Sequence, residues 1–133
     1  VTIPVYSVNP NKKLSNMSIF SNNDNGPKSS FTARELMEEL EKRDDILLID
    51  IREPHELAKD GIENAMHVPM GEIQNKIPSL PKDKDIIIFC HLGFRSKQVR
   101  NYLRKMGFHK AAHLKGGLYS WNRQMKKIKA AAY

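Results

Sequence analysis

The stretch IIIFCHLGFRSKQVRNYLRKMG, residues 86–107, decides the fold. It opens with the continuous apolar run Ile86–Cys90, which is rich in β-branched residues and typical of a strand buried on both faces of a parallel sheet. From Arg95 to Met106 the apolar residues recur at a helical spacing, and Gly107 is a helix stop signal. The sequence therefore predicts a buried strand, a tight loop and a helix, with Cys90 where the strand ends.

The alternation of strand and helix patterns continues on both sides of this stretch. Upstream, Thr32 stands three residues before Glu35, the spacing of a capping box, and predicts a helix to about Arg43. The other predicted elements are strands at Ile46–Ile51, Ala65–Val68 and Ala111–Leu114, and helices near Gly71–Ile77 and through Leu118, Trp121 and Met125. Such alternation is typical of a three-layer α/β domain with a parallel sheet, in which ligands bind beyond the carboxyl ends of the strands.

The length of 133 residues suits one domain, which we place at residues 31–129. Residues 1–30 are rich in Asn and Ser and show no sustained period, so we interpret them as an N-terminal tail or linker. Residues 130–133 are expected to form a short C-terminal tail. No apolar run approaches the roughly 20 residues of a membrane span, and no secretory signal is visible, so we expect a cytoplasmic protein without membrane contact. Whether the chain is a segment of a longer protein stays open.

Charge and cysteine content limit the possible chemistry. The net charge of +7 could attract nucleic acid, acidic proteins or small anions, but we interpret it as a solvated basic surface and expect no nucleic-acid partner. Lys97 and Arg100 could recruit an anionic donor or an acidic partner. A single cysteine excludes an internal disulfide and fits a reducing compartment. His109 and His113 have a metal-binding spacing, but they are predicted in a turn and a strand without a third ligand, so we expect no metal.

Cys90 is the candidate nucleophile. A cysteine between a buried strand and a helix lies where successive backbone N–H groups can point at its sulfur, and cations nearby favour the reactive thiolate. Arg95 is the nearest cation, and its fork could hold an oxyanion. Gly93 allows the backbone to curl around the sulfur, while Ser96 could cap the helix or donate to an anion.

The loop CHLGFRS resembles the active-site loop of the rhodanese family, C-x-x-G-x-R-S/T. The matching residues are Cys90, Gly93, Arg95 and Ser96. Two further motifs agree: D-x-R-x-x-x-E through Asp50, Arg52 and Glu56, and G-G-x-x-x-W through Gly116, Gly117 and Trp121. The resemblance covers residues 31–127. It departs at residues 60–69, where Gly61, Glu63 and Asn64 stand for the usual His, Pro and Gly.

The resemblance implies a three-layer rhodanese-like fold with a central parallel sheet of about five strands flanked by helices. It implies a thiosulfate sulfurtransferase that takes sulfur from thiosulfate or a protein persulfide onto Cys90 and passes it to cyanide, a thiol or a sulfur-carrier protein. We expect a monomer without a cofactor. Asp50 and Arg52 are expected to support the site through a salt bridge or hydrogen bonds. The loop residues expected to bind substrate are His91, Leu92, Gly93, Phe94, Arg95 and Ser96.

Alternatives to a free-standing sulfurtransferase remain at this point. The chain could be a regulatory or sulfur-relay module. It could also be the C-terminal segment of a ubiquitin-like activating enzyme, in which case the acceptor would be a sulfur-carrier protein. Phosphatases of the same fold use a longer C-x5-R loop, whereas this chain has C-x4-R, and the tighter cradle suits a single sulfur atom better than a tetrahedral phosphate. His91 adjoins the nucleophile, and could either tune it or face solvent.

Overall fold

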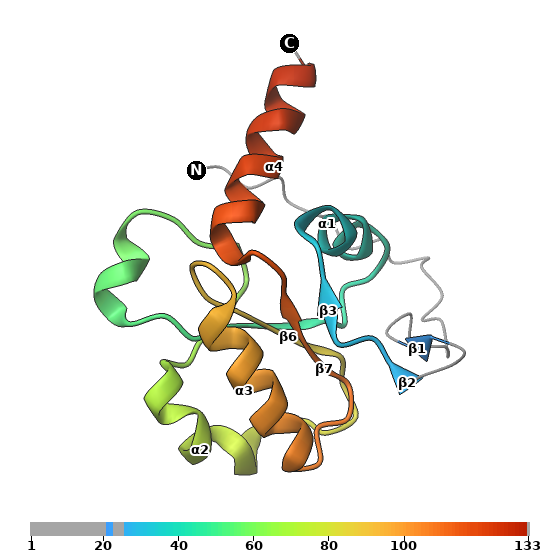
Figure 1. Cartoon of the computed structure of the whole chain (residues 1–133), viewed down its shortest axis with the longest axis vertical. Coiled ribbons are helices and arrows are strands. Elements are labelled where there is room, and N and C mark those ends of the chain that lie inside the picture. The colour runs from blue at the N-terminus through green and yellow to red at the C-terminus, as the bar shows by residue number, and fades with distance from the viewer. Residues whose placement is uncertain (1–20, 23–25, 133) are drawn as a thin grey trace.

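A computed structural model describes residues 21–22 and 26–132 of the chain. Its main feature is a parallel sheet of five strands in the order β3-β7-β6-β4-β5 (Figure 1). The strands are β3 (Ser30–Phe31), β4 (Leu47–Asp50), β5 (Met66–His67), β6 (Ile86–Phe89) and β7 (Ala111–Leu114). The parallel α/β architecture predicted from the sequence is confirmed, and β6 is the central strand.

Helices cover both faces of the sheet (Figure 1). Helices α1 (Ala33–Lys42) and α4 (Gly117–Ala132) contact each other on one face, whereas α3 (Phe94–Lys105) packs against β6 and β7 on the other, near the short α2 (Ile73–Lys76). Single 3-10 turns occupy Pro54–Ala58, Met70–Glu72 and Ile77–Ser79, and a separate antiparallel pair is formed by β1 (Ser21–Asn22) and β2 (Gly26–Pro27). Within the described residues, no helix is long and apolar enough to cross a membrane.

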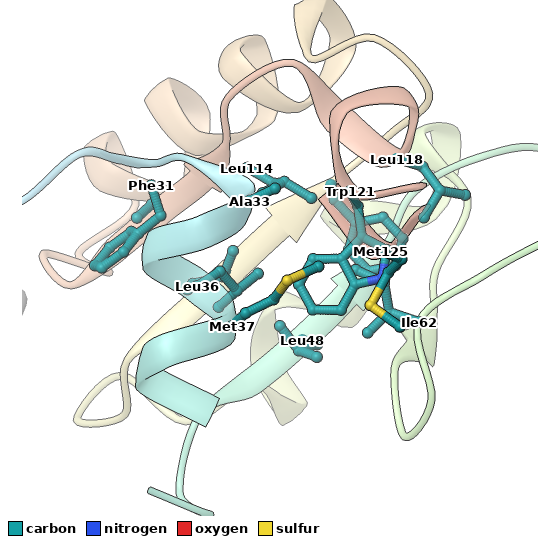
Figure 2. Packing of buried hydrophobic residues seen from close by; sticks show 13 residues of the cluster. Phe31, Ala33, Leu36, Met37, Leu48, Ile62, Leu114, Leu118, Trp121 and Met125 are labelled. Carbon is teal, nitrogen blue, oxygen red and sulfur yellow. The ribbon is translucent and has the colours of Figure 1, made fainter. Parts of the chain in front are cut away.

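Strand β6 contributes to a hydrophobic core on each side of the sheet. Ile87 and Phe89 belong to the cluster under α1 and α4, which includes Trp121 (Figure 2). Ile88 and Cys90 belong to the second cluster, under α2 and α3. Burial of each large apolar side chain contributes roughly 1.5–3 kcal/mol, so the central strand is firmly held on both faces. The residue that follows this strand is therefore placed on a rigid support.

The predicted start of α1 is confirmed in atomic detail. Thr32 Oγ1 accepts a hydrogen bond from the N–H of Glu35 at 3.1 Å, and Glu35 Oε1 accepts one from the N–H of Thr32 at 2.8 Å. The two bonds satisfy N–H groups that the first turn of a helix cannot pair internally. Phe31 and Leu36, on either side of this cap, are both buried in the cluster that holds Trp121.

Secondary structure crosses both predicted limits of the domain. Strand β3 begins at Ser30, within the predicted tail, because its residues pair with β7. Helix α4 continues to Ala132, beyond the predicted limit at 129, since no stop signal follows Met125 in its repeating pattern. Most of the predicted tail, residues 1–20 and 23–25, lies outside the described residues. The domain limits themselves stay a prediction.

The departure from the family pattern at residues 60–69 has a conformational explanation. Asn64 has a φ of 69°, in the left-handed region, at the position where the family pattern has Gly. Asn adopts this conformation more readily than β-branched residues do, because its short amide side chain can hydrogen-bond locally. The backbone shape that glycine permits is thus retained by a different residue.

Candidate active site

Cys90 follows the last residue of the central strand, and its side chain is 1% exposed. Its sulfur accepts hydrogen bonds from two backbone N–H groups, that of Gly93 at 3.1 Å and that of Ser96 at 3.4 Å. Both donors belong to the turn that starts α3, so the loop folds back around the sulfur. Such donors suit a sulfur that carries negative charge, as a thiolate or a persulfide does.

Glycines in two elements allow the loop to close. Gly93 has a φ of 102°, and a Cβ there would lie 3.1 Å from the amide nitrogen of Gly116. Gly117 has a φ of 61°, and a Cβ there would lie 2.6 Å from the carbonyl oxygen of Cys90 and 2.4 Å from that of His91. The N–H of Leu118 donates to the Cys90 carbonyl at 2.9 Å, so the first turn of α4 holds the loop through these close contacts.

Arg95 is paired with an acidic residue from another part of the chain. Its two terminal nitrogens donate to the carboxylate of Glu56 at 2.7 and 2.9 Å. These bonds raise the pKa of Arg95 and, together with an N–H from Glu53, lower the pKa of Glu56 to about 2. In this structure Glu56 accepts from both terminal nitrogens of the Arg95 fork, and the expectation that this fork could hold an oxyanion stays a prediction. Arg95 still places positive charge near the sulfur.

The predicted salt bridge between Asp50 and Arg52 is present and buried. Arg52 is 2% exposed and donates to both carboxylate oxygens of Asp50, at 2.9 Å for the shorter Nη2 bond. It also donates to Asp60 Oδ1 at 2.7 Å and to the carbonyl oxygen of Glu56 at 3.1 Å. Arg52 thus ties the end of β4 to the 3-10 turn that carries Glu56. Both residues are buried, so this pair is not a pair of exposed surface charges.

Ser96 links the cysteine to a buried histidine. Its hydroxyl lies 3.6 Å from Cys90 Sγ, 3.1 Å from the carbonyl oxygen of Gly93 and 3.1 Å from His113 Nδ1. Burial is the main cause that lowers the pKa of His113 to about 4, with Arg100 and two lysines adding to it. The imidazole is therefore neutral at pH 7. Ser96 does not cap α3, since the N-cap position is Gly93.

Comparison with known proteins identifies the family. The family described as Rhodanese-like domain matches residues 32–124 of the chain. The chain belongs to the rhodanese-like domain family. A protein of Allochromatium vinosum named sulfurtransferase is 39% identical over 88 residues, which are 66% of this chain and 82% of that protein. The thiosulfate sulfurtransferase GlpE of Coxiella burnetii is 31% identical over 83 residues, covering 62% of this chain and 78% of GlpE.

A solved structure agrees with this assignment. The crystal structure of a rhodanese-related protein from Thermoplasma volcanium superposes with a TM-score of 0.66 at 29% identity. The superposition covers 72% of this chain and 92% of that protein. The five-stranded parallel sheet is therefore the rhodanese-like sheet, as expected from the sequence resemblance.

Three residues of the rhodanese-like loop point away from the sulfur. His91 is exposed, and its ring lies edge-on to Tyr119 with centroids 6.4 Å apart. Leu92 is 49% exposed and Phe94 is 75% exposed. In this conformation these side chains form the outer surface of the loop and make no hydrogen bond to Cys90. Their predicted part in substrate binding stays a prediction.

Sequence reasoning missed two residues of this site. Glu56 was visible in the D-x-R-x-x-x-E motif, but the motif does not say which cation it meets. His113 was considered only as a possible metal ligand with His109. The sequence did indicate a structural role for His113, because a histidine inside the apolar strand β7 must find a hydrogen-bond partner when it is buried.

Proposed function

We propose that this rhodanese-like protein is a sulfurtransferase that carries sulfane sulfur as a persulfide on Cys90. The observation that supports this most directly is the loop in which the N–H groups of Gly93 and Ser96 both donate to the cysteine sulfur. A cysteine that served only to fill the core would need no donors of this kind. The names of the related sulfurtransferases agree with this chemistry.

In the proposed reaction, the thiolate of Cys90 attacks the outer sulfur of the donor. For thiosulfate, a new S–S bond forms to Cys90, the bond within thiosulfate breaks, and sulfite leaves with the electron pair. The outer sulfur then passes to a nucleophilic acceptor such as cyanide or a thiol, and the thiolate of Cys90 is restored. Loop N–H groups and the positive charge of Arg95 stabilise the anionic sulfur at each stage.

Thiosulfate is the donor we propose to test first, because GlpE of Coxiella burnetii is named for it. A protein persulfide as donor and a sulfur-carrier protein as acceptor are also compatible with an exposed loop surface formed by Leu92 and Phe94. A lone free thiol keeps its reactivity in a reducing compartment, so we propose that the protein acts in the cytoplasm.

The site gives little support to phosphate-ester chemistry at Cys90. An oxyanion enzyme needs donors that hold several oxygens of a tetrahedral group, and Arg is the usual bidentate ligand for them. Here both terminal nitrogens of Arg95 are bonded to Glu56, and the loop N–H groups of Gly93 and Ser96 point at the sulfur itself. The cradle thus matches one sulfur atom better than a phosphate.

The deciding experiment is the intact mass of the reduced protein before and after incubation with thiosulfate. We expect a gain of one sulfur atom, about 32 Da, that dithiothreitol removes, as expected for a persulfide on an activated thiolate. A Cys90→Ser variant should show no gain. If neither thiosulfate, polysulfide nor a protein persulfide changes the mass, the proposed transfer is wrong.

A further inference from the structure

A pocket of about 540 Å³ lies beside the cysteine loop, and its lining does not include Cys90. It is bordered by α3, by the connection between β7 and α4, and by the residues that lead into β3. Its charged or titratable lining residues, within the described part of the chain, are all basic: Lys97, Arg100, His113 and Lys115. Leu92 and Phe94 form an apolar part of the same lining, which Ser29 and Ser30 complete on the side of β3.

The positive charges of this pocket have no acidic partners among the described residues. Arg100 is 9% exposed, yet its guanidinium donates only to neutral oxygens, the carbonyl of Ser29 at 3.0 Å and the side-chain oxygen of Asn101 at 2.8 and 3.0 Å. An arginine has five N–H donors, so these three bonds leave two available. None of the ion pairs found in residues 26–132 includes Lys97, Arg100 or Lys115.

The lowered pKa of His113 is a second sign that these cations lie around one place. Besides burial, it is the charges of Arg100, Lys97 and Lys115 that lower the pKa of His113 to about 4. All three cations therefore act on the same buried ring, and an anion bound beside it would offset their charge.

We propose that this pocket binds a small organic phosphate, with the phosphate on Lys97, Arg100 and Lys115 and the organic part against Leu92 and Phe94. A phosphate monoester carries close to two negative charges and three acceptor oxygens. It therefore suits a site with three cations better than a carboxylate, which has one charge and two oxygens. The volume exceeds that of a phosphate alone and falls in the range of small-molecule sites.

The pocket has direct structural links to Cys90. Gly93 lines the pocket and also donates its N–H to the cysteine sulfur. His113 lines the pocket and bonds through Nδ1 to Ser96, whose hydroxyl lies 3.6 Å from the same sulfur. A ligand here would thus lie next to the reacting cysteine without occupying its cradle. The proposal does not depend on sulfur transfer and stands or fails on binding alone.

Phenyl phosphate is the probe for the test, with benzoate and phenol as comparison ligands. NMR signals of the His113 ring report on binding. We expect a saturable shift with phenyl phosphate and a rise in the His113 pKa of about 1–3 units, the effect of an opposite charge a few ångströms away. Benzoate should bind about tenfold or more weakly, and phenol should give no saturable shift. Equal binding of benzoate, or no saturation with phenyl phosphate, would overturn the proposal.

Charge variants locate the ligand. The double variant Lys97→Gln with Lys115→Gln removes two charge-assisted contacts and should weaken phenyl phosphate binding by about tenfold or more. The matched control, Lys105→Gln with Lys126→Gln, changes the net charge equally at exposed positions away from the pocket lining. It should keep the affinity of the unmodified protein. An equal loss in both variants would mean that the overall charge attracts the anion, and the assigned pocket would be wrong.

Discussion

The guanidinium of Arg95 is held by the carboxylate of Glu56, 39 positions earlier in the chain, through two hydrogen bonds of 2.7 and 2.9 Å. Glu56 lies on a 3-10 turn, and Arg52 holds this turn by donating to the Glu56 carbonyl oxygen. Arg52 thus holds the turn that carries Glu56, and Glu56 in turn orients the guanidinium of Arg95. Arg95 acts as a positioned positive charge whose two terminal nitrogens are already bonded.

Replacing Glu56 with glutamine should slow persulfide formation. The Glu56→Gln variant keeps the shape of the side chain but removes the charge that orients Arg95. A charge-assisted pair contributes roughly 1.5–3 kcal/mol, so we expect kcat/KM with thiosulfate to fall about tenfold or more. Steady-state kinetics with cyanide as acceptor measure this. Glu63→Gln, at an exposed position, is the control and should retain full activity; equal rates for both variants would contradict a role for the pair.

The buried His113 should make the stability of the protein depend on pH. Its pKa is lowered from 6.5 to about 4 in the folded state, so between these values the unfolded chain binds a proton that the folded chain does not. Stability is then constant above about pH 6.5 and declines as the pH falls towards 4, by about 3 kcal/mol for this residue. Urea unfolding of the protein and of His113→Asn from pH 7.5 to 4 tests this. The difference in free energy of unfolding between the unmodified protein and the variant should change between pH 6.5 and 4. Parallel curves of stability against pH would contradict the prediction.

The close contact between Gly117 and the cysteine loop should not tolerate a side chain. In Gly117→Ala, the new Cβ would meet the Cys90 and His91 carbonyls at under 3 Å in a left-handed conformation. The conformation alone costs about 1–2 kcal/mol, and the clash must also displace the loop. We expect a lower free energy of unfolding and loss of persulfide formation. Gly71→Ala is the matched control, because a Cβ there has nothing within 4 Å. Equal stability of the two variants would contradict this prediction, because it would mean that the loop moves away from the added methyl group without a cost in free energy.

Removal of the Arg52 side-chain charge should be among the most destabilising single changes. Arg52→Met leaves the buried Asp50 carboxylate without its cation, and a broken buried pair costs about 3–5 kcal/mol. Chemical denaturation measures the loss. Arg34→Met breaks the exposed pair with Glu38 and should cost at most about 1 kcal/mol. A small effect of Arg52→Met would mean that water replaces the arginine at this site.

Local patterns along the chain were sufficient for much of the fold. The continuous apolar run of β6 predicted a strand buried on both faces, and the Thr32 and Glu35 pair predicted the start of α1. These features depend on residues close in sequence, whose periodicity and capping chemistry are local properties. The loop from Cys90 to Ser96 was predicted for the same reason, since it joins two strongly patterned elements.

Contacts between distant segments were not predictable in this way. The pairing of β3 with β7 is encoded by two residues, Ser30 and Phe31, too few to show a period. The 3-10 turn at Pro54–Ala58 likewise has no repeating pattern, so the position of Glu56 opposite Arg95 could not be predicted.

The sequence by itself determined the family and the α/β class and pointed to Cys90 as the candidate nucleophile, because short stretches of contiguous residues encode each of them. The tertiary structure alone decided that Arg95 pairs with Glu56, that His113 hydrogen-bonds to Ser96, and that three cations line one pocket. The physical reason is that these relationships join side chains from different strands and turns. Hydrogen bonding and Coulomb forces act over a few ångströms of space, and only the folded chain brings such residues within that range.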